Sequence, residues 1–417
     1  MTHLNSQPVM TRVEGVGSKS ARTQRGFTLI ELMVSITLGL LIMVALTAVF
    51  LNVSRTNNEM VKTNGLIENG RFAIDILKEN IEHGGFWGGY IPQFDDLTSA
   101  SIPGDAPLSA PDPCLAYSVA NWTTAYKNAL TGIPVQSFTD VPTGVTGCVA
   151  FVTNKKASTD VLVVRHAANC VPGTTNCEAL DNTKVYFQAS FCENETTALT
   201  PMRYVMSNTS TDFTLKKRGC TGTPPAATIG TVSELRKLIS NIYYIRTYAT
   251  TVGDGIPTLM RASFNATGGT PVFDAPVALI EGIEGFFVEL GIDSKSRCTA
   301  FSNSYATAVA RVRPSTCVVD ADAVKNTMPS NRGDGVPETP FVRCAGAGGC
   351  TAAQLTDVVA VKLYVLARTT QTALGYTDQK TYKLGSKTLG PFNDNYKRHV
   401  FETTVRLTNV SGRRETP

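Results

Sequence analysis

The sequence predicts an α+β protein in which one long N-terminal α-helix packs on an antiparallel β-sheet head. Residues 27–51 are almost all apolar, and residues 52–83 continue with apolar side chains at helical spacing. From residue 160 onward, short segments rich in β-branched and aromatic residues alternate with Gly, Pro, Asn and Asp. Such segments are typical of strands and turns. A long helix followed by many strands favours an α+β architecture.

The apolar run starts after Arg25 and is expected to form a transmembrane helix over residues 27–51, since about 20 residues suffice to cross a bilayer. Glu31 is the one carboxylate in the run, and no charged residue occurs from Leu32 to Ser54. A carboxylate inside a membrane helix costs roughly 2.5–3.5 kcal/mol on insertion scales. Glu31 is therefore expected to have a cationic partner. The alternative is that it lies at headgroup level and is merely solvated.

Residues 1–26 form a polar leader with a basic bias: Arg12, Lys19, Arg22 and Arg25 against Glu14. The positive-inside rule places this leader in the cytoplasm. A secretory signal peptide would also begin with a basic region. However, the segment 45–58 has no clear A-x-A-like cleavage site, and the apolar run is longer than an ordinary signal core. A plain membrane anchor is a further alternative, but it leaves Glu31 unexplained.

A sevenfold apolar repeat extends the helix into water. Its members are Val53, Met60, Ile67, Ile74 and Ile81, with Leu66, Phe72 and Leu77 widening the stripe. Polar residues occupy the other faces, so residues 52–83 are expected to be an amphipathic half whose stripe packs on the head. The pair Gly84-Gly85 predicts the end of the helix. At 1.5 Å per residue, residues 27–82 would span roughly 85 Å.

Residues 84–417 are expected to form a β-rich head. Residues 84–160 are rich in Gly, Pro, Ser and Thr and are expected to contain loops, short helices and a first disulfide. The expected strands are Asp160–Arg165, Lys184–Ala189, Ile242–Tyr248, Thr258–Ser263, Phe286–Ile292, Val358–Ala367 and Val400–Leu407. The segment Glu234–Ile239 fits either a short helix or a further strand.

All ten cysteines lie between Cys114 and Cys350. An even number confined to the exported part indicates disulfides formed in an oxidising compartment. No C-x-x-C pair occurs, which disfavours zinc. The sequence leaves the connectivity open. Pairing of sequential cysteines would give Cys114–Cys148, Cys170–Cys177, Cys192–Cys220, Cys298–Cys317 and Cys344–Cys350, each contributing about 2–4 kcal/mol.

Nothing in the sequence points to catalysis or to nucleic acid. The net charge is +4 and the basic residues are scattered, which gives no basic patch for a nucleic acid. None of the common hydrolase, metalloprotease or nucleotide-binding motifs occurs. Of the four histidines, His166 and His399 are expected at the surface or at strand edges. We therefore expect no catalytic residue, no metal ligand and no cofactor.

Three glycine-containing segments are expected to be simple turns or loops. Asp334 and Glu338 offer too few oxygen ligands for a calcium loop, so Gly333-Asp334-Gly335 is expected to be a turn. The same holds for Gly253-Asp254-Gly255. The segment 346–349 lies between two cysteines and lacks a following Lys-Ser/Thr, so it is expected to be a disulfide-closed loop and not a phosphate-binding loop.

The start of the apolar run resembles the cleavage and assembly signal of type IV prepilins. Its residues are Gly26-Phe27-Thr28-Leu29-Ile30-Glu31, preceded by Arg25. In that family a membrane peptidase cuts after the glycine, here Gly26, and methylates the new terminal residue, here Phe27. The family's glutamate, here Glu31, attracts the terminal amine of its own or a neighbouring chain. The resemblance implies that residues 1–26 are removed, that the chain spans the inner membrane once with its head in the periplasm, and that it reaches the pilus and cell surface after assembly.

The C-terminal half is similar to the PilW family of type IV minor pilins, through Tyr243–Arg246, Leu259–Arg261, Leu279–Gly285, Asp357–Arg368 and Arg398–Leu407. This similarity implies a type IV pilin-like fold and a structural, non-enzymatic role in initiating pilus assembly. It implies as partners other minor pilins, the major pilin, a tip adhesin and, transiently, prepilin peptidase. Residues 84–230 and 293–356 match least, so loop insertions are expected around 84–160 and 293–356. The family often has an acidic loop where this chain has Asp293-Ser294-Lys295-Ser296-Arg297.

Two alternative functions remain open at this point. A minor pseudopilin of a type II secretion system would share the N-terminal signal and a tip position. A membrane-anchored periplasmic enzyme or binding domain would share only the anchor, and the absence of catalytic motifs weighs against it. Within the pilin interpretation, the loops at 84–160 or 293–356 could themselves bind a surface.

Overall fold

The computed structural model describes residues 26–95, 104–139, 148–196, 203–222, 229–265, 271–293, 335–345 and 349–414. The chain divides into two compact units, Met1–Asn58 and Glu59–Pro417. Helix α1 (Leu29–Glu82) contributes to both units, and antiparallel sheets make up the second, which confirms the α+β class. The expectations for the leader residues 1–25, for Cys298–Cys317 and for Asp334 lie outside the described residues.

In the described residues after α1, the elements are short helices and twelve strands. The helices are η1 (Gln93–Asp95), α2 (Thr124–Gly132), η2 (Cys148–Ala150), α3 (Glu193–Thr196), η3 (Ser210–Asp212), α4 (Ala352–Thr356) and α5 (Thr408–Arg414). The strands are β1 (Val135–Phe138), β2 (Val161–Ala167), β3 (Tyr186–Ala189), β4 (Tyr204–Ser207), β5 (Leu235–Arg246), β6 (Thr258–Ser263), β7 (Val277–Glu281), β8 (Ile283–Ile292), β9 (Val358–Arg368), β10 (Tyr382–Leu384), β11 (Lys387–Leu389) and β12 (Arg398–Arg406).

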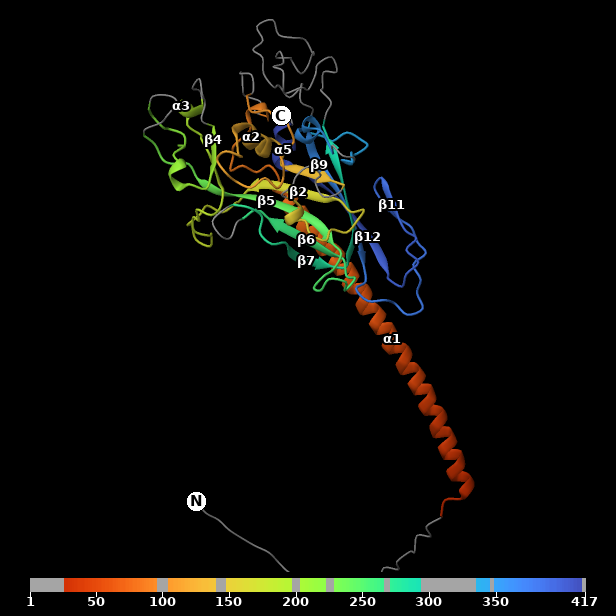
Figure 1. Ribbon diagram of the computed structural model, residues 1–417. Coiled ribbons are helices and arrows are strands. Elements are labelled where there is room, and N and C mark those ends of the chain that lie inside the picture. Colours follow the sequence, from red (N-terminus) through yellow and green to blue (C-terminus); the bar gives the residue numbers. More distant parts are fainter. Residues whose placement is uncertain are drawn as a thin grey trace, which may run out of the picture. The chain divides into compact units, whose positions relative to one another are not determined.

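The larger sheet has seven strands and is built around β5, its longest strand (Figure 1). Its order is β1-β2-β5-β3-β4, and β6 joins β5 to β7. Every pairing is antiparallel. The segment Glu234–Ile239, for which the sequence left helix and strand open, lies in this sheet because β5 already begins at Leu235. The expected strand Ile242–Tyr248 is thus the second half of a longer strand.

The central strands of the larger sheet are buried on both faces, as β5 shows, because successive side chains of a strand point to opposite faces. In β5, Tyr243 and Ile245 belong to a first core that also contains Leu77 of α1. Their neighbours Ile242 and Tyr244 belong to a second core around Trp87 and Trp122. Burial on both faces explains why these strands are apolar almost without alternation.

A second, three-stranded sheet has the order β12-β9-β8. Strand β9 lies in the centre and is rich in valine and leucine, residue types that pack well on a pleated surface. One face of this sheet contributes Val361, Val365 and Phe286 to the first core. The other face is covered by the β10–β11 hairpin, which lies alongside β12 in Figure 1 and buries Tyr382 against Tyr364 and Leu366.

The buried face of α1 differs from the sevenfold repeat that the sequence suggested. The buried residues of α1 are Leu66, Gly70, Ala73, Leu77 and Ile81. Ile67 and Ile74 pack only partly against the core, and Phe72, expected in the stripe, is 53% exposed. Met60 is 59% exposed. The expectation is confirmed for Leu66, Leu77 and Ile81 and was wrong for Met60 and Phe72. Met60 leaves the buried face because a straight helix has 3.6 residues per turn, so that a strict sevenfold repeat drifts away from one fixed face.

The helix ends where the sequence predicted. The Gly84 N–H donates to the carbonyl of Ile81 at 2.8 Å. Gly85 then adopts φ = +75°, the left-handed conformation in which helices commonly end. Its N–H donates to the Arg165 carbonyl of β2 at 3.1 Å. The chain thus passes directly from α1 onto the large sheet.

Candidate functional site

Thr28 and Glu31 form a capping box at the start of α1. The backbone N–H and the hydroxyl of Thr28 both donate to Glu31 Oε2, at 3.0 and 2.8 Å. In return the Glu31 N–H donates to Thr28 Oγ1 at 3.3 Å. Reciprocal bonds of this kind satisfy backbone donors that the first helical turn leaves without partners. The Glu31 carboxylate is therefore held beside residues 27 and 28.

Gly26 and Phe27 precede this capping box and belong to no helix or strand. Phe27 is 82% exposed. A Cβ atom added to Gly26 would meet nothing within 4 Å. The peptide bond between them is thus accessible, two residues before the helix begins at Leu29.

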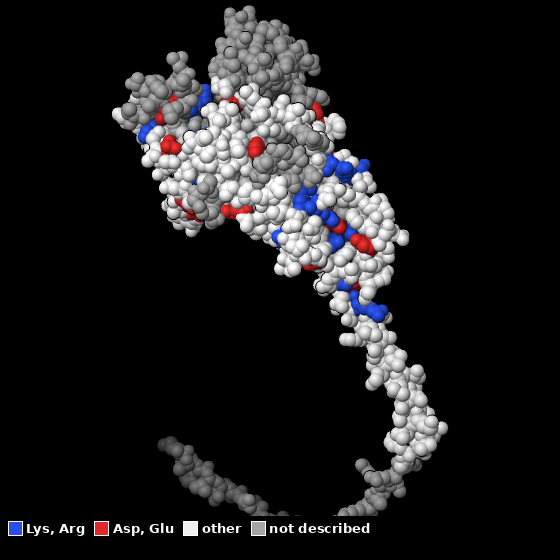
Figure 2. All heavy atoms as spheres, viewed as in Figure 1, with Lys and Arg blue, Asp and Glu red and all other residues white. Residues whose placement is uncertain are grey.

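The part of α1 that follows Glu31 is long and apolar enough to cross a membrane. Residues 32–54 carry no charged side chain, so this stretch of α1 appears white in Figure 2. The hydroxyls of Ser35, Thr37 and Thr47 donate to helix carbonyls one turn earlier. These intrahelical bonds satisfy polar groups that would otherwise be costly to place in a bilayer.

Among the described residues of the second unit, four disulfides join Cys114–Cys148, Cys170–Cys177, Cys192–Cys220 and Cys344–Cys350. Each joins two cysteines that follow one another in the sequence, so these four bridges agree with the sequential pairing. The last one closes the loop that contains residues 346–349. No cysteine is free within the described part of the chain.

A buried ionic cluster centred on Arg398 holds the C-terminal strands together. The Arg398 guanidinium contacts Glu284 at 2.6 Å, Asp378 at 2.8 Å and Asp394 at 2.6 Å. These partners come from β8, from the segment before β10 and from the segment before β12. Glu284 is also 3.5 Å from the Arg368 guanidinium and 3.7 Å from Lys156 Nζ. Three cations thus face three carboxylates, so the charges of the cluster are compensated. We interpret it as a structural feature.

His166 contradicts the sequence expectation. It lies in the middle of the sheet in β2 and is only 6% exposed, whereas a surface or strand-edge position was expected. Its Nδ1–H donates to the Ala167 carbonyl at 2.9 Å, and its Nε2 accepts from Asn80 Nδ2 at 3.1 Å. Burial lowers the pKa of His166 to about 4. His166 therefore packs as a neutral residue between α1 and the sheet, while His399 is exposed in β12 as expected.

Asp254 forms a turn, as expected for Gly253-Asp254-Gly255. Its carboxylate accepts backbone N–H bonds from Ala249, Thr250, Thr251 and Ile256. The two glycines adopt φ values of +92° and +69°, a region that favours glycine. Bonds from backbone donors lower the pKa of Asp254 to about 2.

No group of three or more His, Cys, Asp or Glu side chains that could hold a metal ion occurs among the described residues. The sequence predicts Gly26, Phe27 and Glu31 as site residues, whereas Thr28, which bonds to Glu31, was not among them. The pattern Thr-x-x-Glu before an apolar run is a readable capping-box signature. No local sequence pattern indicates the partners of Arg398 or the burial of His166, because both depend on contacts between segments that are distant in the sequence.

Two family models match the chain. Residues 21–47 match the prokaryotic N-terminal methylation motif. Residues 242–409 match the family described as type IV pilus-assembly protein W. The second match begins within β5 and runs through β12 into α5. Comparisons with curated proteins and with solved structures find no match.

Proposed function

Since the chain matches a PilW-type pilin with a prepilin motif, we propose that it is a structural minor pilin that helps to initiate type IV pilus assembly within a tip complex. The observation that carries the proposal is the combination of two features in one chain. A methylation motif with an ordered Thr28–Glu31 pair precedes an uncharged helical stretch, and a PilW-type region contributes the strands from the second half of β5 to β12.

The proposed role divides the chain into four parts. Residues 1–26 are a leader that prepilin peptidase removes. Residues 27–51 hold the chain in the inner membrane and later pack in the filament. Residues 52–83 support the head, residues 84–417, which lies in the periplasm before assembly. The methylation motif and the apolar helix indicate a membrane-anchored pilin.

Glu31 is proposed to fix the axial register of the subunit. Cleavage after Gly26 would leave an ammonium at Phe27 and a carboxylate at Glu31. In a low-dielectric helix bundle, a close ion pair offsets part of the desolvation that a lone charge would suffer. The amine of a neighbouring chain would therefore be drawn to the Glu31 carboxylate, which the capping box already orients.

The head is proposed to supply contacts to other minor pilins, to the major pilin and to a tip adhesin. A pilus-assembly family favours this assignment over a type II secretion pseudopilin. Deletion of the gene separates the two functions. We expect loss of surface pili with secretion through the type II system unchanged, and the reverse pattern would contradict the pilus assignment.

The first test is the N-terminal mass of the protein extracted from its native membrane. The proposal requires a chain that begins at N-methylated Phe27. A Gly26→Ala variant should remain uncut, and because a Cβ at this position meets no other atom, its fold should be unchanged. If the wild-type chain begins at Met1, or after Leu51, the result would contradict the proposed function in a filament.

The second test concerns Glu31. Glu31→Gln keeps the shape of the side chain and an oxygen for the Thr28 bonds but removes the charge. We expect normal membrane insertion and cleavage, with incorporation into sheared pili strongly reduced. Thr37→Ala is the matched control, because the Thr37 hydroxyl bonds only to the carbonyls of Met33 and Val34 in its own helix. Wild-type incorporation of Glu31→Gln would contradict the proposed register.

A further inference from the structure

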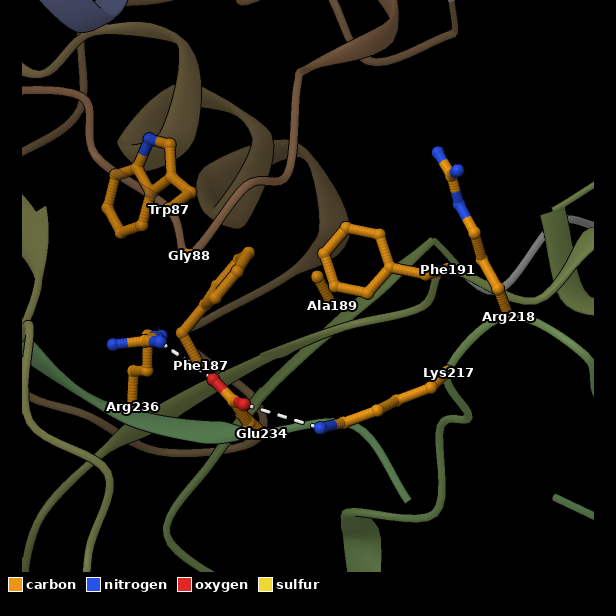
Figure 3. Close-up of a pocket in the computed structure, with 9 residues that line it drawn as sticks. All are labelled: Trp87, Gly88, Phe187, Ala189, Phe191, Lys217, Arg218, Glu234 and Arg236. Carbon is orange, nitrogen blue, oxygen red and sulfur yellow. Dashed lines mark hydrogen bonds and ion pairs between the residues drawn. The ribbon is translucent and has the colours of Figure 1, made fainter. Parts of the chain in front are cut away.

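The charged groups of the pocket in Figure 3, which has a volume of about 370 Å³, bond to one another. Glu234 Oε1 lies 3.3 Å from Lys217 Nζ, and Glu234 Oε2 lies 2.7 Å from Arg236 Nη2. Arg236 also donates to the backbone carbonyls of Ala168 and Asn169. Because these charges already have partners within the chain, we assign no ligand to this pocket.

A leucine at the tip of the loop between β9 and β10 is almost fully exposed. Leu374 is 94% exposed, more than any other large apolar side chain among the described residues, whereas its neighbour Ala373 is 1% exposed. Single exposed apolar side chains are common on protein surfaces, so exposure alone assigns no partner to Leu374. The rigidity of the loop, its position and its charge do.

Hydrogen bonds to the segment before β12 hold the loop in place on both sides of Leu374. The Ala373 N–H donates to the Asn395 carbonyl at 2.8 Å, and the Asp378 N–H donates to the Asp394 carbonyl at 2.7 Å. Leu374 therefore protrudes from an ordered loop. A side chain presented in this way loses little conformational entropy when it enters an apolar layer.

The loop is bonded to α1 shortly after the charge-free stretch of that helix. Lys62 Nζ donates to the Thr372 carbonyl at 2.8 Å, so the loop lies at the end of the head where α1 enters the second unit (Figure 1). The charge-free stretch ends at Ser54, and the helix from there to Lys62 measures about 12 Å. A lipid headgroup layer is roughly 5–7 Å thick, and the chain from Thr372 to Leu374 can span about 7 Å. The headgroup layer is therefore within reach of Leu374.

Exposed apolar side chains of α1 continue beyond the charge-free stretch. Met60 is 59% exposed and Val61 is 71% exposed. Both directly precede Lys62, the residue that bonds to the loop. The apolar surface of the proposed membrane segment thus extends along α1 to the residues beside this loop.

The exposed part of the loop has no negative charge. From Thr369 to Lys380 the one carboxylate is that of Asp378, which is fully buried and lies 2.8 Å from the Arg398 guanidinium. Lys380 is exposed. A loop with an apolar tip and an exposed cation suits the surface of a bilayer that contains anionic lipids, which would repel a carboxylate.

We propose that the loop between β9 and β10 contacts the membrane, with Leu374 inserted into the headgroup layer of the bilayer that α1 spans. Lys380 is then attracted to the phosphate groups of anionic lipids. This contact is a second attachment of the chain to the bilayer, and it fixes the orientation of the head before the subunit leaves the membrane. It requires the membrane anchoring that the proposed pilin function includes.

Photocrosslinking of the full chain tests the contact. The crosslinker p-benzoylphenylalanine replaces Leu374, Leu108 or Met43, one at a time, and the chain is reconstituted in nanodiscs of phosphatidylethanolamine and phosphatidylglycerol. All three side chains are exposed in the free chain, so the fold should tolerate the substitutions. We expect lipid adducts at positions 374 and 43 and none at position 108, as measured by mass spectrometry of the peptides.

Leu108 is the matched negative control because it is equally apolar and is 80% exposed. Its segment packs near the opposite end of α1, since Pro107 lies beside Gly132 and the nearby Pro134 lies beside Gly85. From Lys62 to Gly84, α1 and its C-terminal turn measure about 33 Å. A bilayer that touches the β9–β10 loop is therefore too distant to label position 108.

Met43, in the charge-free stretch of α1, separates this proposal from the proposed function. Lipid adducts at position 43 without any at position 374 would overturn the membrane contact of the loop and leave the anchor intact. Adducts of position 374 with a second copy of the chain in place of lipid would also overturn it, as would equal lipid labelling of positions 374 and 108. An absence of lipid adducts at position 43 would contradict the membrane anchor itself.

A second measurement tests whether Leu374 holds the loop at the bilayer. With the crosslinker at the exposed Gln371 of the same loop, Leu374→Asp should reduce the yield of lipid adducts at least about threefold, because a charged tip no longer enters the headgroup layer. Leu108→Asp is the control and should leave the yield unchanged. An unchanged yield in Leu374→Asp would overturn the role of Leu374.

Discussion

Gly70 of α1 lies directly against the ring of Phe401 in β12. A Cβ atom built on Gly70 would come 2.1 Å from Cε2 of that ring. Glycine in the middle of a helix ordinarily destabilises it by roughly 0.5–1 kcal/mol relative to alanine. Its presence here is explained by the close approach of the helix backbone to the three-stranded sheet. Gly65, one turn and a half earlier, has no atom within 4 Å of such a Cβ.

This contrast predicts opposite effects for two identical substitutions. Gly70→Ala should destabilise the head by about 1–3 kcal/mol, because the added methyl overpacks the contact with Phe401. Gly65→Ala should stabilise it by roughly 0.5–1 kcal/mol through helix propensity. Thermal unfolding followed by tryptophan emission measures both, since Trp87 and Trp122 are buried in the head. Equal stability changes of the same sign in the two variants would contradict the packing of α1 on β12.

Much of the fold could be predicted because it depends on local patterns. The apolar run, the Gly84-Gly85 stop and Thr258–Ser263, which matches β6, are all readable from neighbouring residues. The short strands β10 and β11 were not predicted. Each has only three residues and is stabilised by packing on the three-stranded sheet, a contact that no local pattern records.

The same distinction applies to single residues. Glu31 could be proposed as a site residue because a carboxylate in an apolar run is costly wherever the chain folds. His166 was misplaced because its flanking residues suit either an edge or a central strand. Its burial follows from the pairing of β2 with both β1 and β5 and from Asn80 on α1. Contacts of this kind depend on the tertiary structure and cannot be derived from local spacing.

The burial of the His166 imidazole predicts that the stability of the head depends on pH. Its pKa is lowered by burial to about 4 in the folded state, against about 6.5 when unfolded. Between these values the unfolded chain binds more protons than the folded one, so stability rises with pH. The full stability is present above pH 6.5, and roughly 3 kcal/mol of it should be lost as the pH falls to 4.

Unfolding in urea at pH 7 and at pH 5, followed by tryptophan emission, measures this effect. In His166→Gln the difference between the two pH values should be clearly smaller than in the wild type. His399→Gln changes an exposed histidine of β12 and should retain the wild-type difference. An unchanged pH dependence in His166→Gln would show that other groups cause it.

Arg398→Met should destabilise the head by about 3–5 kcal/mol, since it leaves the buried Asp378 and Glu284 without their shared cation. The neighbouring Lys397→Met breaks the partly exposed ion pair with Glu59 and should cost no more than about 1 kcal/mol. Arg398 also holds the pKa of Asp394 below its ordinary value. That contribution is present above about pH 4 and is lost as the pH falls further. Comparable melting temperatures for the two variants would contradict the central place of Arg398.

Thr28 is predicted to act as a positioning residue for Glu31, a prediction that rests on the proposed pilin function. Thr28→Val keeps the shape of the side chain but removes the hydroxyl that donates to Glu31 Oε2 and accepts from the Glu31 N–H. The loss of an N-cap costs typically about 1 kcal/mol, which is small beside the membrane anchoring of the helix. The carboxylate would nevertheless lose one of its two fixed bonds and turn away from the chain terminus.

We therefore expect Thr28→Val to be inserted and cleaved normally but to enter pili less efficiently than the wild type, with Thr28→Ser restoring incorporation. The ratio of protein in sheared pili to protein in the membrane measures this, and the N-terminal mass verifies cleavage. Full incorporation of Thr28→Val into pili would mean that Glu31 can pair with the amine of a neighbouring chain without the hydrogen bond from the Thr28 hydroxyl.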